Sequence, residues 1–104
     1  MSNQDIREHL ASARLASSEM GISTVQTVAD AAEALLSMRP VTPDSEWELM
    51  DTVNRSVDVV SLLIHDASRR RQGHPPAALH EAVHTLLEQI ERLRPGLVRE
   101  ELTH

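Results

Sequence analysis

The sequence predicts an all-α fold, a small bundle of three to four helices in a single domain that spans residues 1–104. Apolar residues recur at steps of three and four along most of the chain, which is the period of a helix that buries one face. The chain has one Trp and no Phe or Tyr, so its core must consist of Leu, Val, Ile, Ala and Met, a composition that suits helix packing. Its prolines and glycines fall between the periodic segments or at their ends.

These breaks divide the chain into four helical segments. Gly21 follows the first segment as a left-handed cap, and Arg39-Pro40 stops the second. Ser23 and Gln26 have the spacing of a capping box, so we expect their side chains to cap the second helix. The predicted helices cover roughly residues 3–20, 23–38, 43–71 and 77–94.

The third segment is the longest and has the clearest start. Thr42 occupies the N-cap position and Pro43 the first helical position, where proline is favoured. Nothing interrupts the segment before RRRQGHPP, which predicts one central helix of roughly 40 Å at 1.5 Å per residue. The three arginines at 69–71 fall in its last turn, where cations are favoured. We therefore interpret them as helix-terminal charge rather than as a phosphate-binding patch.

The first, third and fourth segments each carry an apolar stripe that should face the other helices. The stripe of the first segment is thin and rich in Ala, so we expect this helix to be weakly anchored; it comprises Ile6, Leu10, Ala13, Ala16 and Met20. The main stripe of the third segment comprises Met50, Val53, Val57, Val60, Ile64 and Ala67, widened by Leu49 and Leu63. The fourth segment has the most regular pattern, with Leu79, Ala82, Val83, Leu86, Leu87, Ile90 and Leu93 on one side.

Composition excludes several classes of function. The chain has no Cys, which rules out disulfides and thiolate chemistry. Its net charge of −6 and its single aromatic residue argue against direct nucleic-acid binding, because phosphate contacts and base stacking supply that affinity. The first ten residues lack the apolar region of a signal peptide, and the most apolar stretch, VDVVSLLI, is too short to span a bilayer. We expect a cytoplasmic protein that uses no cofactor.

Residues 80–84 read HEAVH and match H-E-x-x-H, in which two histidines hold zinc and the glutamate acts as base. A small zinc hydrolase that uses His80, Glu81 and His84 is therefore an alternative function. On a helical wheel, however, the histidines lie about 100° and 140° from Leu79, away from the core side. Leu87 also stands where the extended motif needs Gly. The candidates for a third ligand lie near the two prolines or in the tail: His74, Glu100, Glu101 and His104. We expect no catalytic residue and no metal site.

A second surface is predicted on the third helix. Trp47, Val59 and Leu62 fall outside its main apolar stripe, interleaved with Arg55 and Asp58. Trp and Arg near a surface are favoured anchors of protein interfaces. We expect these five residues to contact a second copy of the chain or another protein, with Asp58 at the rim. Coverage of more than one side of the helix by the chain itself is the alternative explanation.

The layout of residues 22–67 carries a family resemblance. A helix with VADAAEALLSM, a Pro-containing loop and a long helix ending VVSLLIHDA are similar to short helical-hairpin domains of unknown function from pseudomonads. The whole chain resembles small quorum-sensing antiactivators. The resemblance implies a helical protein that binds a LuxR-type transcription factor and blocks its dimerisation or DNA binding, without enzymatic activity. Another helical partner-binding protein, such as a toxin–antitoxin-like module, would have the same sequence features.

Overall fold

A computed structural model of the chain describes residues 3–39, 42–69 and 76–99, and it confirms the all-α fold. Four helices follow one another along these residues: α1 (Asn3–Met20), α2 (Ser23–Leu36), α3 (Pro43–Arg69) and α4 (Ala77–Leu93). α2 ends two residues before the predicted position and α4 one residue before it. The arginines at positions 70 and 71 lie outside the described residues. None of the four helices is long and apolar enough to cross a membrane, as judged over the described residues.

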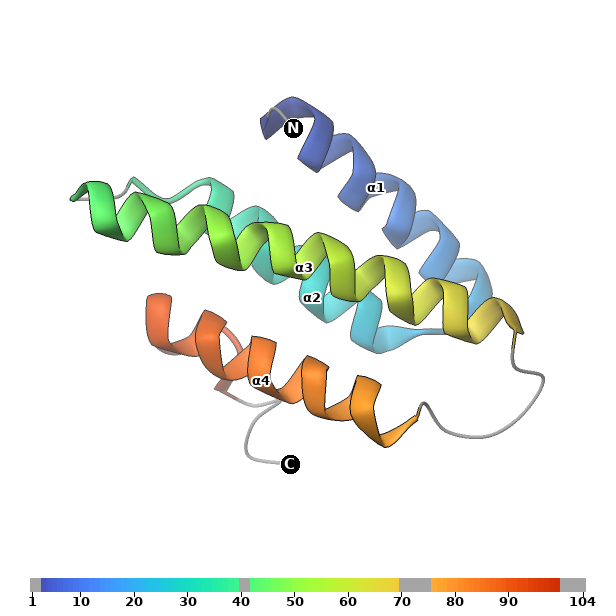
Figure 1. The fold of residues 1–104 in the computed structure, drawn as a ribbon. Coiled ribbons are helices and arrows are strands. Elements are labelled where there is room, and N and C mark those ends of the chain that lie inside the picture. Colours follow the sequence, from blue (N-terminus) through green and yellow to red (C-terminus); the bar gives the residue numbers. More distant parts are fainter. Residues whose placement is uncertain (1–2, 40–41, 70–75, 100–104) are drawn as a thin grey trace.

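The helices form a flattened bundle around α3, with extents of 45 × 30 × 19 Å. α2 packs along α3, and these two helices are separated along the chain by a short connection (Figure 1). α1 lies on one side of the α2–α3 pair and α4 on the opposite side (Figure 1). The predicted long central helix is therefore correct, and α3 contacts all three other helices.

The helix ends show which local predictions hold. Gly21 has a φ of +73°, as the left-handed cap requires, and the Ile22 N–H donates to the Ser17 carbonyl at 3.0 Å. The Thr42 hydroxyl accepts the Ser45 N–H at 3.1 Å, which confirms the predicted N-cap of α3. The capping box of α2 is wrong. Ile22 occupies the N-cap position without a side-chain cap, and Ser23 already belongs to the helix.

The first helix is attached by fewer apolar residues than predicted. Ile6 and Leu10 are fully buried and Ala13 is nearly so, whereas Met20 is exposed. The buried stripe continues instead through Ser17, whose hydroxyl donates to the Arg14 carbonyl at 2.9 Å and so is satisfied without a core partner. Polar contacts add to this attachment, because the Arg14 guanidinium bridges from α1 to Asp30 and Glu33 on α2.

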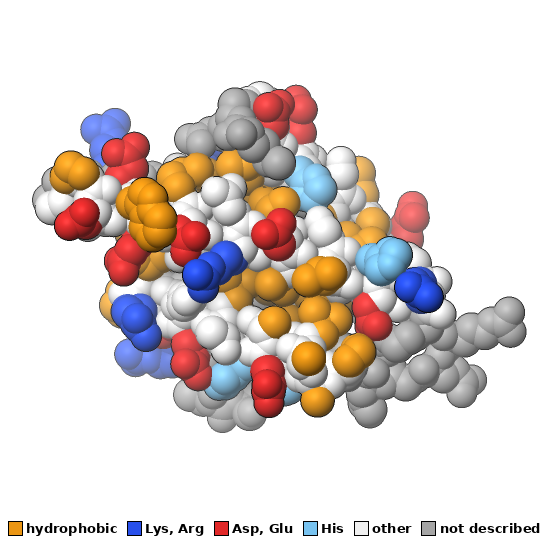
Figure 2. Space-filling view, in the orientation of Figure 1, with side chains coloured by type: hydrophobic (Ala, Val, Ile, Leu, Met, Phe, Trp, Pro, Cys, Tyr) orange, Lys and Arg blue, Asp and Glu red, His pale blue; other side chains and the backbone are white. Residues whose placement is uncertain are grey.

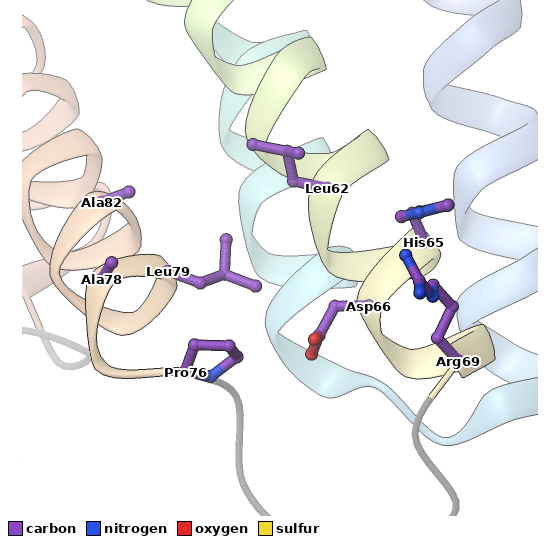
Figure 3. Close-up of a pocket in the computed structure, with 8 residues that line it drawn as sticks. All are labelled: Leu62, His65, Asp66, Arg69, Pro76, Ala78, Leu79 and Ala82. Atoms are coloured by element: carbon purple, nitrogen blue, oxygen red, sulfur yellow. The ribbon is translucent and has the colours of Figure 1, made fainter.

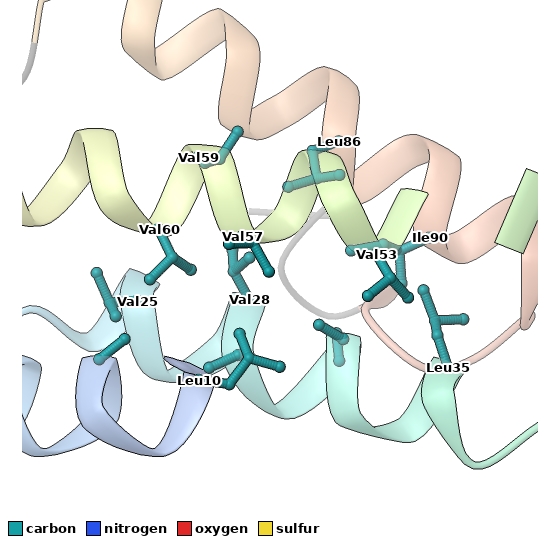
Figure 4. Packing of buried hydrophobic residues seen from close by; sticks show 14 of the residues in the cluster. Leu10, Val25, Val28, Leu35, Val53, Val57, Val59, Val60, Leu86 and Ile90 are labelled. Carbon is teal, nitrogen blue, oxygen red and sulfur yellow. The ribbon is translucent and has the colours of Figure 1, made fainter. Parts of the chain in front are cut away.

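The core lies between α3 and its neighbours, and it is built from aliphatic side chains (Figure 4). Val53 and Val60 of α3 are fully buried with Leu35 of α2 and Ile90 of α4. The buried arc of α3 is wider than its predicted stripe, because it also includes Thr52, Ser56 and Val59. The two hydroxyls donate to carbonyls four residues earlier, at 2.9 and 2.8 Å, so their burial leaves no unpaired group.

The segment after α4 folds back onto the bundle. Val98 is 1% exposed, although the sequence around it is mostly polar. The Glu91 carboxylate accepts the backbone N–H groups of Gly96 and Val98, the latter at 3.0 Å. These two hydrogen bonds lower the pKa of Glu91, and the Arg99 guanidinium at 3.8 Å lowers it further.

Candidate interaction surface

A groove runs along the line where the second half of α3 meets α4. One part of it has a volume of about 610 Å³ and lies between Leu62, Asp66 and Arg69 of α3 and Ala78, Leu79 and Ala82 of α4. A neighbouring part of about 420 Å³ shares Ala78 and Ala82 with the first and continues past Val59 and Leu86. We call the two parts together the α3–α4 groove. Figure 2 shows hydrophobic side chains gathered between these helices, with charged side chains around them.

The groove follows from small side chains at one helical spacing. Ala78 and Ala82 are one turn apart on α4, so they lie one above the other on the side that faces α3. Because each side chain is a single methyl group, the two alanines leave the groove open beside α3. Leu62 and Leu79 lie on the two walls of the resulting hollow, and Pro76 closes one end of it (Figure 3).

Two of the predicted contact residues project from α3 into solvent. The Leu62 residue is 54% exposed at the groove, and Trp47 is 71% exposed near the start of the helix. Trp47 adjoins a smaller hollow of about 130 Å³ that it lines with Gln89, Arg92 and Leu93. Trp47 and Leu62 are thus large apolar side chains placed along the same α3–α4 boundary.

The prediction for Val59 is wrong as regards its position. Val59 is 8% exposed and belongs to the core, where it points from α3 towards α4 near Leu86 (Figure 4). The third helix is therefore covered by its own chain on this side, which was the alternative explanation. Val59 supports the floor of the groove rather than offering a free contact.

Charged side chains of both signs surround the groove. Arg55 is exposed, and its Nε lies 3.2 Å from the Asp51 carboxylate one turn earlier. Asp58 is also exposed, as expected for a rim residue. Asp66, Arg69 and Glu81 complete the charged set among the lining residues. The rim is therefore close to neutral, although the whole chain carries a net charge of −6.

The polar side chains of the HEAVH segment lie at the surface of α4. His80, Glu81 and His84 are exposed, while Val83 of the same segment is buried in the core. The predicted orientation of the two histidines away from the core is confirmed. No group of three or more His, Cys, Asp or Glu side chains that could hold a metal occurs within the described ranges. The third-ligand candidates at 74, 100, 101 and 104 lie outside those ranges.

Two features of the structure, one in the groove and one after α4, were not predicted from the sequence. Ala82 was predicted in the core stripe of α4, but it is only partly buried and lines the groove together with Ala78. The small size of these side chains could have predicted the groove, because two alanines one turn apart leave space beside a neighbouring helix. The contact of Glu91 with the segment after α4 also had a signal, a carboxylate placed just before a Pro-Gly turn.

Comparison with protein-family models, with curated proteins and with solved structures finds no match to this chain. Fold and surface together define, over the described residues, a bundle of four helices with an apolar groove between the third and the fourth. Its function must therefore be argued from that surface.

Proposed function

We propose that this chain is a non-enzymatic protein-interaction module, an antiactivator that acts in the cytoplasm on a LuxR-type quorum-sensing transcription factor, similar to QslA. The observation that carries the proposal is the exposed Leu62 beside the apolar α3–α4 groove. Large apolar side chains that protrude next to a hollow are typical of surfaces that bind protein, because association removes them from water.

The groove suits an amphipathic helix of the partner. Such a helix places apolar side chains at every third or fourth position, and these could enter the hollow above Ala78 and Ala82. Leu62 would then pack against the same helix from the side, and Trp47 would extend the contact along α3. If the captured helix belongs to the dimerisation surface of the regulator, binding prevents the regulator from forming the dimer that recognises DNA. This mechanism needs no cofactor or catalytic group.

The same surface supports self-association. A two-fold interface requires one patch that complements itself. Here a protruding Leu62 adjoins a hollow, and both signs of charge are present on the rim. We therefore propose that the chain forms a homodimer through α3 and α4 when the partner is absent, and that Arg55 and Asp58 lie at the edge of this contact.

A matched pair of variants tests the proposal. Leu62→Asp puts a charge at the groove, whereas Leu15→Asp puts the same charge on α1, where Leu15 is 72% exposed. Each LuxR-type regulator encoded in the source genome is co-expressed with either variant and co-purified, and the mass of the free chain is measured by light scattering. We expect Leu62→Asp to lose regulator capture and Leu15→Asp to retain it. Equal capture by the two variants, or no capture of any regulator by the unaltered chain, would refute the proposal.

A further inference from the structure

The structure places His80 and His84 one turn apart on the exposed side of α4, and the inference from this pair does not depend on the proposed function. We propose that His80 and His84 form a two-histidine chelate for a divalent transition metal, with Cu²⁺ bound most tightly. This site is not the zinc hydrolase centre suggested by the HEAVH motif. It has two protein ligands and leaves the remaining coordination positions to water.

The geometry of α4 places the two imidazoles for chelation. The helix is continuous from Ala77 to Leu93, so residues four apart have Cβ atoms about 5–6 Å apart. Both histidines are exposed, and they line one shallow hollow together with Glu81 and Thr85. Buried Val83 and Leu86 fix this helix to the core from the opposite side. The pair is therefore held on a rigid element, which keeps the second imidazole near an ion bound by the first.

A second observation concerns how His84 is oriented. Its Nε2 lies 2.8 Å from the Glu88 carboxylate, one further turn along the helix. A neutral imidazole that donates from Nε2 keeps its lone pair on Nδ1. Metal-binding histidines commonly donate their other ring N–H to a carboxylate in this manner, which fixes the ring and makes the ligand more basic. Glu88 thus supplies the outer partner that such a ligand needs.

The donor set selects the class of ion. Imidazole nitrogens bind Cu²⁺, Ni²⁺ and Zn²⁺, and for a given set of nitrogen ligands Cu²⁺ binds most tightly. Ca²⁺ and Mg²⁺ require several oxygen ligands, which this pair does not provide. Glu81 and Glu88 place negative charge beside the two rings, and the chain as a whole is acidic. Both features favour a cation at this face.

The test uses the full-length chain without an affinity tag. CuSO₄ is titrated into the protein in a calorimeter, and the complex is examined by electron paramagnetic resonance. We expect one saturable Cu²⁺ with coupling to two imidazole nitrogens. His80→Ala and His84→Ala should each weaken binding by about a hundredfold, because either change turns a chelate into a single contact. His65→Ala removes an exposed histidine of α3 and serves as the control, for which the affinity should not change.

Two results would overturn the inference. The first is Cu²⁺ affinity that is equal in His80→Ala, His84→Ala and the unaltered chain, which would place the ion elsewhere. The second is a resonance spectrum without nitrogen coupling in the unaltered chain. Circular dichroism of each variant accompanies the titration, so a loss of binding counts as support where the helical signal is retained.

Discussion

Val59 and Leu62 are three residues apart on α3, and they differ in burial and in the role that we expect for each. Val59 is 8% exposed and Leu62 is 54% exposed. Substituting each by Asp introduces the same carboxylate, once inside the core and once at its edge. The two variants should therefore differ in kind, one losing the fold and the other losing association.

The expected loss for Val59→Asp can be worked out from its burial. Burying a Val side chain contributes about 1.5–3 kcal/mol, and an unpaired polar group in its place adds about 1–3 kcal/mol. We expect the free energy of unfolding to fall by about 3–5 kcal/mol, a large part of the roughly 5–15 kcal/mol typical of a domain. Leu62→Asp should change it by no more than about 0.5 kcal/mol, as exposed substitutions do.

Urea denaturation followed by far-UV circular dichroism measures both values, at a protein concentration where the chain is monomeric. If the slope of the unfolding free energy against urea concentration is the same in all variants, the midpoints report stability rather than a change in the unfolded chain. The reasoning would be refuted by equal losses in the two variants, or by a greater loss for Leu62→Asp. Equal losses would mean that the core holds both side chains alike, and a greater loss for Leu62→Asp would mean that it holds Leu62 rather than Val59.

Two further predictions concern the attachment of α1 and of the segment after α4. Leu10→Ala removes about three methylene equivalents from a fully buried site and should cost about 3 kcal/mol of unfolding free energy, whereas Leu15→Ala on the exposed side of α1 should cost less than about 0.5 kcal/mol. Equal urea midpoints would contradict this. The N–H groups of Gly96 and Val98 lower the pKa of Glu91. The ionised carboxylate therefore stabilises the fold at pH values above the unfolded pKa of about 4.3. This stabilisation is lost as the pH falls through the lower pKa of the folded state. The stability difference between the unaltered chain and Glu91→Gln should therefore be largest near neutral pH and vanish in acid; a difference independent of pH would exclude the ionised carboxylate as its source.

The helices could be predicted because their signals are local. The turn after α1 requires a left-handed backbone, which Gly21 adopts. The Thr42 side chain accepts a free N–H group at the start of α3. Neither feature depends on which helices pack nearby. The predicted capping box of α2 is wrong because the helix begins one residue earlier than the box requires. The chain already turns at Gly21, so the helix begins with Ser23 inside it and Ile22 in the cap position.

The candidate interaction surface was harder to predict, because burial on α3 depends on which helix covers each side. A wheel shows that Val59 and Leu62 lie outside the main stripe, but it cannot show that α4 reaches one of them and not the other. Val98 presents the same difficulty, since its burial depends on a carboxylate seven residues earlier that holds the returning backbone. Trp47 and Leu62 were predicted at a surface, and both are exposed.

The groove itself follows from a mismatch between the two helices that form it. α3 has 27 residues and an apolar surface wider than one stripe, whereas α4 has 17 residues and presents two alanines to the second half of α3. Larger side chains at those two positions would have filled the hollow and covered Leu62 within a single chain. With alanine there, Val59 is covered while Leu62, one turn further on, is left half-exposed beside an open hollow. A second protein surface would remove this apolar side chain from water, which is favourable. The proposed function therefore rests on Leu62 rather than on His80, Glu81 and His84.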